Sequence, residues 1–505
     1  MTYLAITTEA DSPFGAGGII VVAIYLGLMI AFGLAGRFAR KENSLGDFFL
    51  GGRSLGFFVL LMTLYATQYS GNTLIGYAGK AYRSGFEVLV SLPFMMAGIG
   101  FYLLYAPKLQ RLSREGDFIT LGDYIQRRYN HRWLTSLIAL SGIVALGNFM
   151  ITNLKAMGEM TAVVAGDYLT PTQGILILVV IILIYETLGG LRSVAWTDVL
   201  QGLLLLIGCT IIFTATLSNL GGVSGAADKL HDVRPDFWEP LSTMSCVGWV
   251  SSALIISLGF SLYPQAIQRI YAAKSPKVLR RSLQVMVFMP LVTTLLMVTI
   301  GVLGNIAHPG LDTQSSGGIT MLVLGDYAAS HPAAKWVVFV FVAAVIAAIM
   351  STADSILLAI ASSATQDFFR PLFKTDDQKK LTLLGKVIST GVMIICVLLA
   401  TELPQSIWKL IEIKTELLAQ TAPALICGLH FKKLRAGPVL AGFLAGTIFT
   451  LIFQVGSIVT DNAIPGKPFH IHAGLWGVLL NFALVWIGNC LAARNSNPVK
   501  QVSQG

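Results

Sequence analysis

The chain has 505 residues, of which 54% are hydrophobic and 12% are charged, with a mean hydropathy of +0.71. Soluble proteins carry about a quarter charged residues, so this composition excludes a disordered chain, a collagen-like fibre and a disulfide scaffold and leaves a polytopic helical membrane protein. The net charge of +9 would suggest nucleic-acid binding in a soluble protein, but the positions of the charges along this chain suggest another explanation.

Apolar runs of about 20 residues, the length that crosses a bilayer as a helix, recur along the whole chain. We predict thirteen spans. The span 133–165 is unusually long, and the span 404–430 carries four charged residues. The complete set is 17–37, 55–78, 86–107, 133–165, 171–190, 195–218, 245–271, 282–305, 336–362, 384–401, 404–430, 437–456 and 473–493.

The basic residues predict the orientation of these spans. If the N-terminus lies outside, 25 of the 35 lysines and arginines fall on cytoplasmic segments, six fall on outer segments and four lie within spans. Cytoplasmic loops of membrane proteins are enriched in these residues, so the split favours thirteen spans with the N-terminus outside and the C-terminus inside. It also explains the net charge without nucleic acid. The chain would then end in a short cytoplasmic tail, 494–505.

Two predicted spans are interrupted by small and polar residues. The second contains TQYSGNT at 67–73, and the seventh contains GFSLYPQ at 259–265. Gly71 tolerates almost any backbone conformation, and Pro264 lacks an N–H and frees the carbonyl one turn earlier. Small and polar residues in a single helix could be explained by close packing against a neighbouring helix. Breaks at matching positions in two spans that are five spans apart instead favour an inverted repeat with a substrate site in the middle of the membrane.

The ninth span carries hydroxyls and a carboxylate at helical spacing. Ser351 and Ser355 are four residues apart, Thr352 and Ser355 are three apart, and Asp354 lies among them. Oxygens of this kind suit a small hard cation. Bonds from hydroxyls to their own helix would explain Ser351 and Thr352, but they leave the buried carboxylate of Asp354 unexplained.

Other charged residues near spans have two interpretations each. Asp198 either is interfacial or shares a cation or a proton with Asp354. Lys155, close to Asn153 on the fourth span, either meets a substrate carboxylate or extends to the interface. Glu186 lies near the inner end of its span and is predicted to be solvated.

Three segments resemble one family: SGNTLIGYAGKAYRSG at 70–85, GGLRSVAWTDVLQG at 189–202 and AAIMSTADSILL at 347–358. On these motifs the chain is identified as a member of the sodium/solute symporter family, and the resemblance covers essentially the whole chain. It implies an all-α polytopic membrane protein with the LeuT-like 5+5 inverted repeat. The single transporter domain, 1–505, would comprise an extra first helix (17–37), two five-helix repeats (55–218 and 245–430) and two C-terminal helices (437–493).

The resemblance also implies a sodium site. Matched on the family's motifs, its ligands are the backbone carbonyls of Ala66 and Tyr69 at the first break, the carbonyl of Ala348 and the hydroxyls of Ser351 and Thr352. Sodium would be the coupling ion, and no organic cofactor is expected.

A second cation site is implied by some family members, which use the aspartate of the WTD motif and hydroxyls just after MST. Asp198 and Ser355 match this pattern, whereas Asp354 stands where some of those members have serine. Three interpretations of the site therefore stay open: sodium, a proton or a structural role.

Substrate contacts in the family come from the two broken helices and from the fourth and eleventh spans. The residues at these positions that we predict to contact substrate are Gln68, Ser70, Gly71, Asn72, Thr73, Asn153, Phe260, Tyr263 and Gln265.

The segment LYPQAIQR at 262–269 resembles forms found in the monocarboxylate and pantothenate branches. The predicted function is sodium-coupled symport of a small organic carboxylate (a monocarboxylate, an amino acid or a pantothenate-like acid) by alternating access. Symport of a sugar, a polyol or sialic acid, and proton coupling on the same fold, are the alternatives. We expect a multi-pass plasma-membrane protein, the inner membrane in a bacterium, with no enzymatic activity, no nucleic acid and no obligate protein partner.

Overall fold

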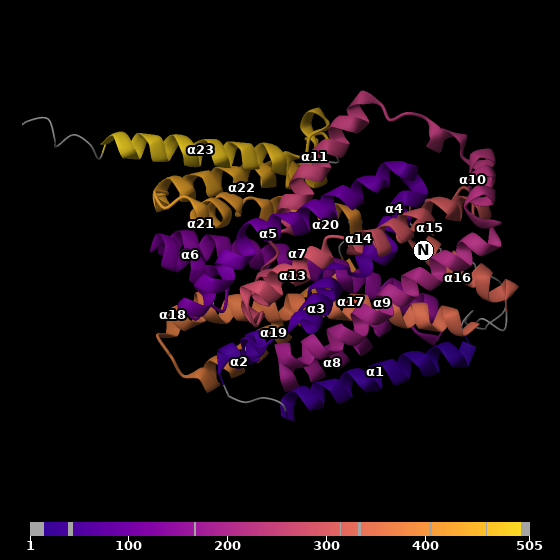
Figure 1. Ribbon diagram of the computed structural model, residues 1–505, viewed down its shortest axis with the longest axis horizontal. Helices are drawn as coiled ribbons and strands as arrows, with labels where there is room; N and C mark the ends of the chain where they lie inside the picture. The colour runs from indigo at the N-terminus through magenta and orange to yellow at the C-terminus, as the bar shows by residue number, and fades with distance from the viewer. Residues whose placement is uncertain are drawn as a thin grey trace, which may run out of the picture.

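The computed structural model describes residues 15–38, 44–165, 168–313, 315–331, 335–402, 407–460 and 462–495. Over these ranges the chain is helical, and its one extended pairing is an isolated bridge between Leu55 and Ala273. Most helices run side by side along the long axis of the view, with α1 at one edge and α22 and α23 at the other (Figure 1). The prediction of an all-helical protein is confirmed.

The α-helices follow one another with short connections. Their bounds are α1 Gly15–Phe38, α2 Leu45–Leu50, α3 Phe57–Gln68, α4 Tyr77–Ser84, α5 Ser91–Glu115, α6 Leu121–Tyr129, α7 Arg132–Ala165, α8 Pro171–Gly189, α9 Leu191–Asn219, α10 Gly222–Val233, α11 Thr243–Phe260, α12 Pro264–Ala272, α13 Pro276–Met286, α14 Met289–Val292, α15 Thr294–Ala307, α16 Ile319–Ser330, α17 Lys335–Ser363, α18 Arg370–Phe373, α19 Gln378–Glu402, α20 Ile407–Ala419, α21 Gly428–His430, α22 Ala436–Val459 and α23 Ala473–Asn495.

Eleven helical stretches of the described chain are long and apolar enough to cross a membrane. The other two predicted spans, 55–78 and 404–430, consist of shorter pieces because the helix is interrupted inside each of them. The first is divided into α3, a π-helical turn at Asn72–Gly76 and α4. The second is divided into α20, a π-helical turn at Pro423–Cys427 and α21. The long prediction at 133–165 is the single helix α7.

Helix α17, which carries the MSTADS motif, is the centre of the bundle. In its most apolar window 94% of the residues are buried, against 22% in α1 and α23. It packs against α9, α7 and α3, so its polar residues face other helices rather than lipid. Hydroxyls and carboxylates in this helix must therefore find their partners inside the protein.

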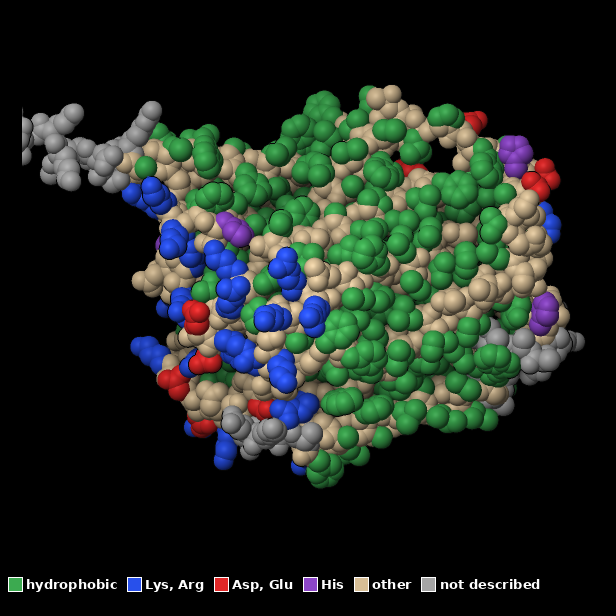
Figure 2. Space-filling view, viewed as in Figure 1, with side chains coloured by type: hydrophobic (Ala, Val, Ile, Leu, Met, Phe, Trp, Pro, Cys, Tyr) green, Lys and Arg blue, Asp and Glu red, His purple; other side chains and the backbone are tan. Residues whose placement is uncertain are grey.

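The molecular surface divides by chemistry. Figure 2 shows hydrophobic side chains over most of the visible face and a concentration of lysine and arginine at one end, around α6 and α18. A broad apolar surface with a basic end is typical of a multi-pass membrane protein. Residues 496–505 of the predicted tail lie outside the described residues.

Candidate functional site

The first break separates α3 from the π-helical turn. Helix α3 ends at Gln68 because Tyr69 adopts an extended conformation (φ −101°, ψ 95°). At Gly71 a Cβ atom would lie 2.4 Å from a side-chain carbon of Ile349 on α17. Only glycine allows this approach, so the break is held directly against the central helix.

The second break separates α11 from α12. Pro264 begins α12 and cannot donate a hydrogen bond to the carbonyl of Phe260, as predicted from the sequence. That carbonyl instead accepts a hydrogen bond from the Tyr102 hydroxyl, at 3.0 Å, and the Ser261 carbonyl accepts one from Tyr105. Both tyrosines lie on α5, three residues apart, and satisfy backbone groups that the break exposes. Sequence reasoning missed them, although their spacing places them on one helix face.

A hydrogen-bonded chain joins the two breaks. Gln68 is the last residue of α3, and its side-chain amide nitrogen donates to the Tyr102 hydroxyl at 2.8 Å. The Tyr102 hydroxyl in turn donates to the backbone carbonyl of Phe260 at the end of α11. The two interrupted helices therefore meet at one place in the bundle, as the inverted repeat requires.

Oxygens predicted to hold sodium come together between α3 and α17. The Thr352 hydroxyl donates a hydrogen bond to the carbonyl oxygen of Ala348 one turn earlier in its own helix, at 3.0 Å, and lies 3.5 Å from the carbonyl oxygen of Ala66 on α3. All three residues are buried. Carbonyl and hydroxyl oxygens in a site closed to water fit a hard monovalent cation. Tyr69 follows Ala66 by one turn and is also buried.

The hydroxyl of Ser351 has a different partner. It donates to one carboxylate oxygen of Asp198, at 2.5 Å, and the Thr63 hydroxyl donates to the other. The guanidinium of Arg269 on α12 lies 3.5 Å from the same carboxylate, and both side chains are completely buried. Asp198 is thus buried inside the helix bundle.

Arg269 also contacts Ser355. Its guanidinium donates to the Ser355 hydroxyl at 2.5 Å, and this hydroxyl lies 3.0 Å from that of Thr67 and donates to the Ser351 carbonyl. In this structure two of the three residues predicted for a second cation or proton site, Asp198 and Ser355, contact the guanidinium. Sequence reasoning assigned Arg269 no role, and the only available signal was an arginine inside a predicted span.

Asp354 belongs to another set of contacts. The Tyr185 hydroxyl donates to one of its carboxylate oxygens, and the other oxygen is buried without a hydrogen bond. Among the described residues no hydrogen bond joins Asp354 to Asp198. Glu186, predicted to be solvated, is only 1% exposed and lies 3.4 Å from the Ser389 hydroxyl, because α19 covers this side of α8. That prediction was wrong.

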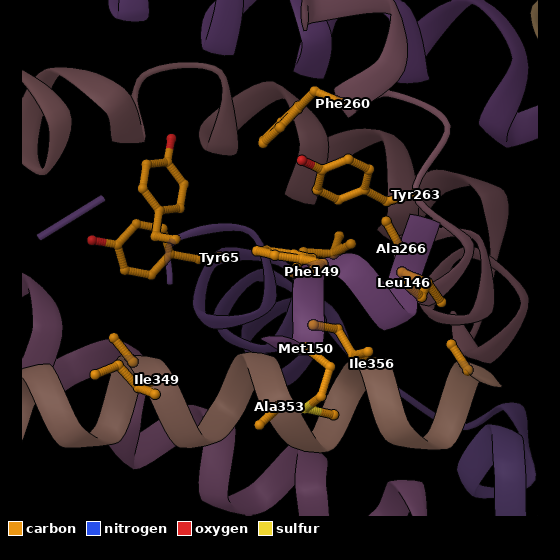
Figure 3. Close-up of a cluster of buried hydrophobic side chains, with 14 of the residues drawn as sticks. Tyr65, Leu146, Phe149, Met150, Phe260, Tyr263, Ala266, Ile349, Ala353 and Ile356 are labelled. Carbon is orange, nitrogen blue, oxygen red and sulfur yellow. The ribbon is translucent and has the colours of Figure 1, made fainter. Parts of the chain in front are cut away.

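The predicted substrate residues that the structure describes are buried around the two breaks. Figure 3 shows the rings of Phe149, Phe260 and Tyr263 grouped together, with ring centroids 5.6 Å apart for Phe149 and Tyr263 and 5.3 Å apart for Phe260 and Tyr263. Ser70 and Thr73 are also buried, whereas the side chain of Asn72 lies outside the described residues. Sequence reasoning missed Phe149, which lies four residues before Asn153 on α7.

Several buried polar atoms at the breaks have no hydrogen-bond partner among the residues that the structure describes. They are the side-chain oxygens of Gln68, Tyr69 and Asn153 and both polar atoms of the Gln265 amide. Buried polar atoms are nearly always paired in native proteins, so unpaired atoms on the residues of the two breaks and of α7 are available for a ligand.

Two broken helices that meet around buried polar groups, in a bundle with many membrane-spanning helices, define a polytopic membrane transporter. The model of the sodium:solute symporter family matches residues 48–446. The chain therefore belongs to the sodium:solute symporter family, and the resemblance stated from its motifs is confirmed.

Curated relatives cover nearly the whole chain. The sodium/pantothenate symporter of Haemophilus influenzae is 25% identical over 489 residues, which is 94% of this chain and 97% of the relative. The high-affinity proline transporter PutP of Bacillus subtilis is 28% identical over 448 residues, which is 86% of this chain and 92% of the relative. These relatives support sodium-coupled symport as the activity of the family.

The fold is similar to that of a solved Na+-coupled sialic acid symporter in a substrate-bound, outward-open state. The TM-score is 0.76 at 20% sequence identity, and the match covers 95% of this chain and 98% of that structure. At this identity the likeness shows the fold alone, which is the LeuT-type arrangement that the motifs implied.

Proposed function

We propose that this protein carries a small organic carboxylate into the cell by sodium-coupled symport with alternating access. The observation that carries the proposal is the meeting of Ala66, Ala348 and Thr352, whose oxygens converge between the first broken helix and the central helix. Relatives named for pantothenate and proline, both carboxylic acids, support the substrate class. A sugar, a polyol or sialic acid remains the alternative cargo.

Sodium at this site would join α3 to α17 and favour the conformation in which both breaks are ordered. Substrate bound at the breaks favours the same conformation, so each ligand tightens the binding of the other. The membrane potential adds roughly 2.3 kcal/mol per charge per 100 mV to the inward movement of sodium. Release of sodium to a sodium-poor interior then loosens the substrate site.

The topology that we propose has thirteen spans, with the N-terminus outside and the C-terminus inside. The repeats at 55–218 and 245–430 each begin with a broken helix, and the basic end of the molecule would face the cytoplasm (Figure 2). This arrangement suits the plasma membrane, which is the inner membrane in a bacterium.

The test is a comparison of thermal unfolding in detergent with sodium, potassium or choline chloride, followed by uptake into proteoliposomes. A ligand that binds only the folded protein raises its melting temperature. We expect stabilisation by sodium alone among these cations, and uptake of one carboxylate that requires an inward sodium gradient. Stabilisation by all three salts alike would contradict the sodium site.

Proton coupling is the second candidate function, and Asp354 favours it. Its carboxylate is buried, has one hydroxyl donor and lies within electrostatic reach of Glu186 and Asp198, whereas Asp198 already has Arg269 as its counter-charge. A proton on Asp354 would relieve this repulsion. Uptake driven by a pH gradient without sodium, and lost in Asp354→Asn but not in the exposed control Asp232→Asn, would establish it. Equal uptake with and without the pH gradient would rule it out.

A further inference from the structure

A buried lysine lies at the aromatic cluster between the two breaks. The side chain of Lys414 on α20 is 3% exposed. Its ammonium nitrogen lies 2.8 Å from the ring centroid of Phe149 and 4.8 Å from that of Tyr263, two rings of the cluster in Figure 3. Tyr263 belongs to the break between α11 and α12, so the positive charge lies against the proposed substrate site.

The acidic residues of the same helix point elsewhere. Glu412 forms an ion pair with Lys467 at 2.7 Å, and Glu416 lies 2.7 Å from His472 and accepts a hydrogen bond from the backbone of Gly474. Glu412 and Glu416 are one turn apart and lie on the same side of α20. Lys414 is two residues from each of them, about 200° around the helix axis, so it lies on the opposite side. The helix therefore presents the carboxylates of Glu412 and Glu416 to the C-terminal part of the chain and the buried ammonium of Lys414 to the breaks.

No counter-charge reaches this ammonium. Throughout the part of the chain that the structure describes, the nitrogen of Lys414 has no hydrogen bond and no ion pair, and α11, which packs against α20, contains no charged residue. Aromatic faces attract a cation, but this attraction is far weaker than the hydration that the ammonium loses on burial. A buried charge normally has a partner, and the described residues supply none for Lys414.

We propose that Lys414 is the specificity-determining residue for the substrate, and that its ammonium binds the substrate carboxylate while the rings of Phe149 and Tyr263 hold the adjoining apolar part. The inference rests on the proposed function and deepens it by naming the residue that selects a substrate bearing a carboxylate. The unpaired amide atoms of Gln68, Asn153 and Gln265 would bond further polar groups of the same molecule. A neutral sugar or polyol would leave the ammonium without its partner.

The experiment compares the wild type with Lys414→Gln, Lys414→Arg and the exposed control Lys432→Gln. Thermal unfolding in sodium chloride is measured with pantothenate, proline or pyruvate, each beside its carboxamide, which lacks the carboxylate, and with glucose. We expect at least one carboxylate to stabilise the wild type and its carboxamide to fail. Lys414→Gln should weaken the binding of that carboxylate by roughly 30- to 5,000-fold, the range for losing one partner of a buried charged pair. Lys414→Arg should restore part of it, and Lys432→Gln should match the wild type.

The outcome separates this inference from the proposed function. Stabilisation by sodium alone is measured first in every variant, and it reports on folding and on the cation site. If sodium stabilises both wild type and Lys414→Gln but the carboxylate binds both equally well, the role of Lys414 is overturned and symport stands. That role is likewise overturned if only glucose stabilises the wild type, or if no carboxylate does. If sodium has no effect on the wild type, the proposed function itself fails.

Discussion

The carboxylate of Asp198 lies 3.5 Å from the guanidinium of Arg269, and neither side chain has any exposed surface. The pair joins α9 to α12, the second half of a broken helix, 71 residues later in the chain. Hydroxyls from α3 and α17 complete the hydrogen bonding of the carboxylate. A buried ion pair is tolerated only when hydrogen bonds satisfy its remaining polar atoms. This network therefore fixes how the four helices pack against one another.

Removing one partner of this pair should destabilise the protein strongly. In Arg269→Gln the carboxylate of Asp198 stays buried without its counter-charge, and we expect a loss of about 3–5 kcal/mol of folding free energy. The double variant Asp198→Asn with Arg269→Gln should lose less than the sum of the two single variants because no uncompensated charge remains. Thermal unfolding in detergent measures all three, and strictly additive losses would show that the two groups are not coupled.

Thr352 should be needed for the response to sodium. Thr352→Ala removes the hydroxyl that meets the carbonyls of Ala66 and Ala348, whereas Thr352→Ser keeps it. One contact to a charged group contributes about 1.5–3 kcal/mol, so sodium affinity should fall by roughly 10- to 100-fold in the alanine variant. The measurement is the sodium dependence of the melting temperature. Thr390→Ala, an exposed threonine that bonds its own helix, is the matched control, and an unchanged sodium titration in Thr352→Ala would place the ion elsewhere.

Tyr102 should stabilise the second break. Tyr102→Phe leaves the carbonyl of Phe260 buried without a donor and removes the acceptor of Gln68, which should cost about 1–3 kcal/mol. Because the ring is retained, packing is nearly unchanged and the loss reports on hydrogen bonding. Tyr168→Phe, at an exposed tyrosine, should have no effect on the melting temperature. If Tyr102→Phe and Tyr168→Phe both have the melting temperature of the wild type, water or another group must donate to the Phe260 carbonyl.

Local chemistry explains how much of this site was predictable. Pro264 removes one backbone donor and Gly71 permits close approach, so both breaks follow from residues within a few positions of them. The hydroxyl spacing of the MST motif predicts that Thr352 contributes to a cation site, and this stays a prediction. The eleven long spans followed from apolar length alone, whereas the predicted spans 55–78 and 404–430, which are divided into shorter helices, both carry polar or charged residues at their interruptions or along their length.

The remaining contacts join residues that are far apart in the sequence, and the spacing of residues along one helix cannot predict such pairs. Arg269 and Asp198 pair across two helices, and Tyr102 bonds a carbonyl more than 150 residues away. Lys414 appeared only as one of four charges that weakened a predicted span, because its orientation is set by how α20 packs on α7 and α11. Rotation of a helix about its own axis is a property of tertiary packing, and a single sequence leaves it open.

Gly259 should tolerate no larger residue, because α11 and α20 touch through their backbones there. A Cβ atom at this position would lie 2.0 Å from the carbonyl oxygen of Thr415, the residue that follows Lys414. Gly259→Ala must push α20 away from α11, and overpacking of this kind costs about 1–3 kcal/mol or more. The same displacement would move the ammonium of Lys414 from the aromatic rings, so we expect both a lower melting temperature and weaker carboxylate binding. Gly391→Ala, in α19 with nothing within 4 Å of its Cβ position, is the matched control and should match the wild type. If Gly259→Ala lowers the melting temperature but leaves carboxylate affinity intact, the position of α20 does not control the substrate site.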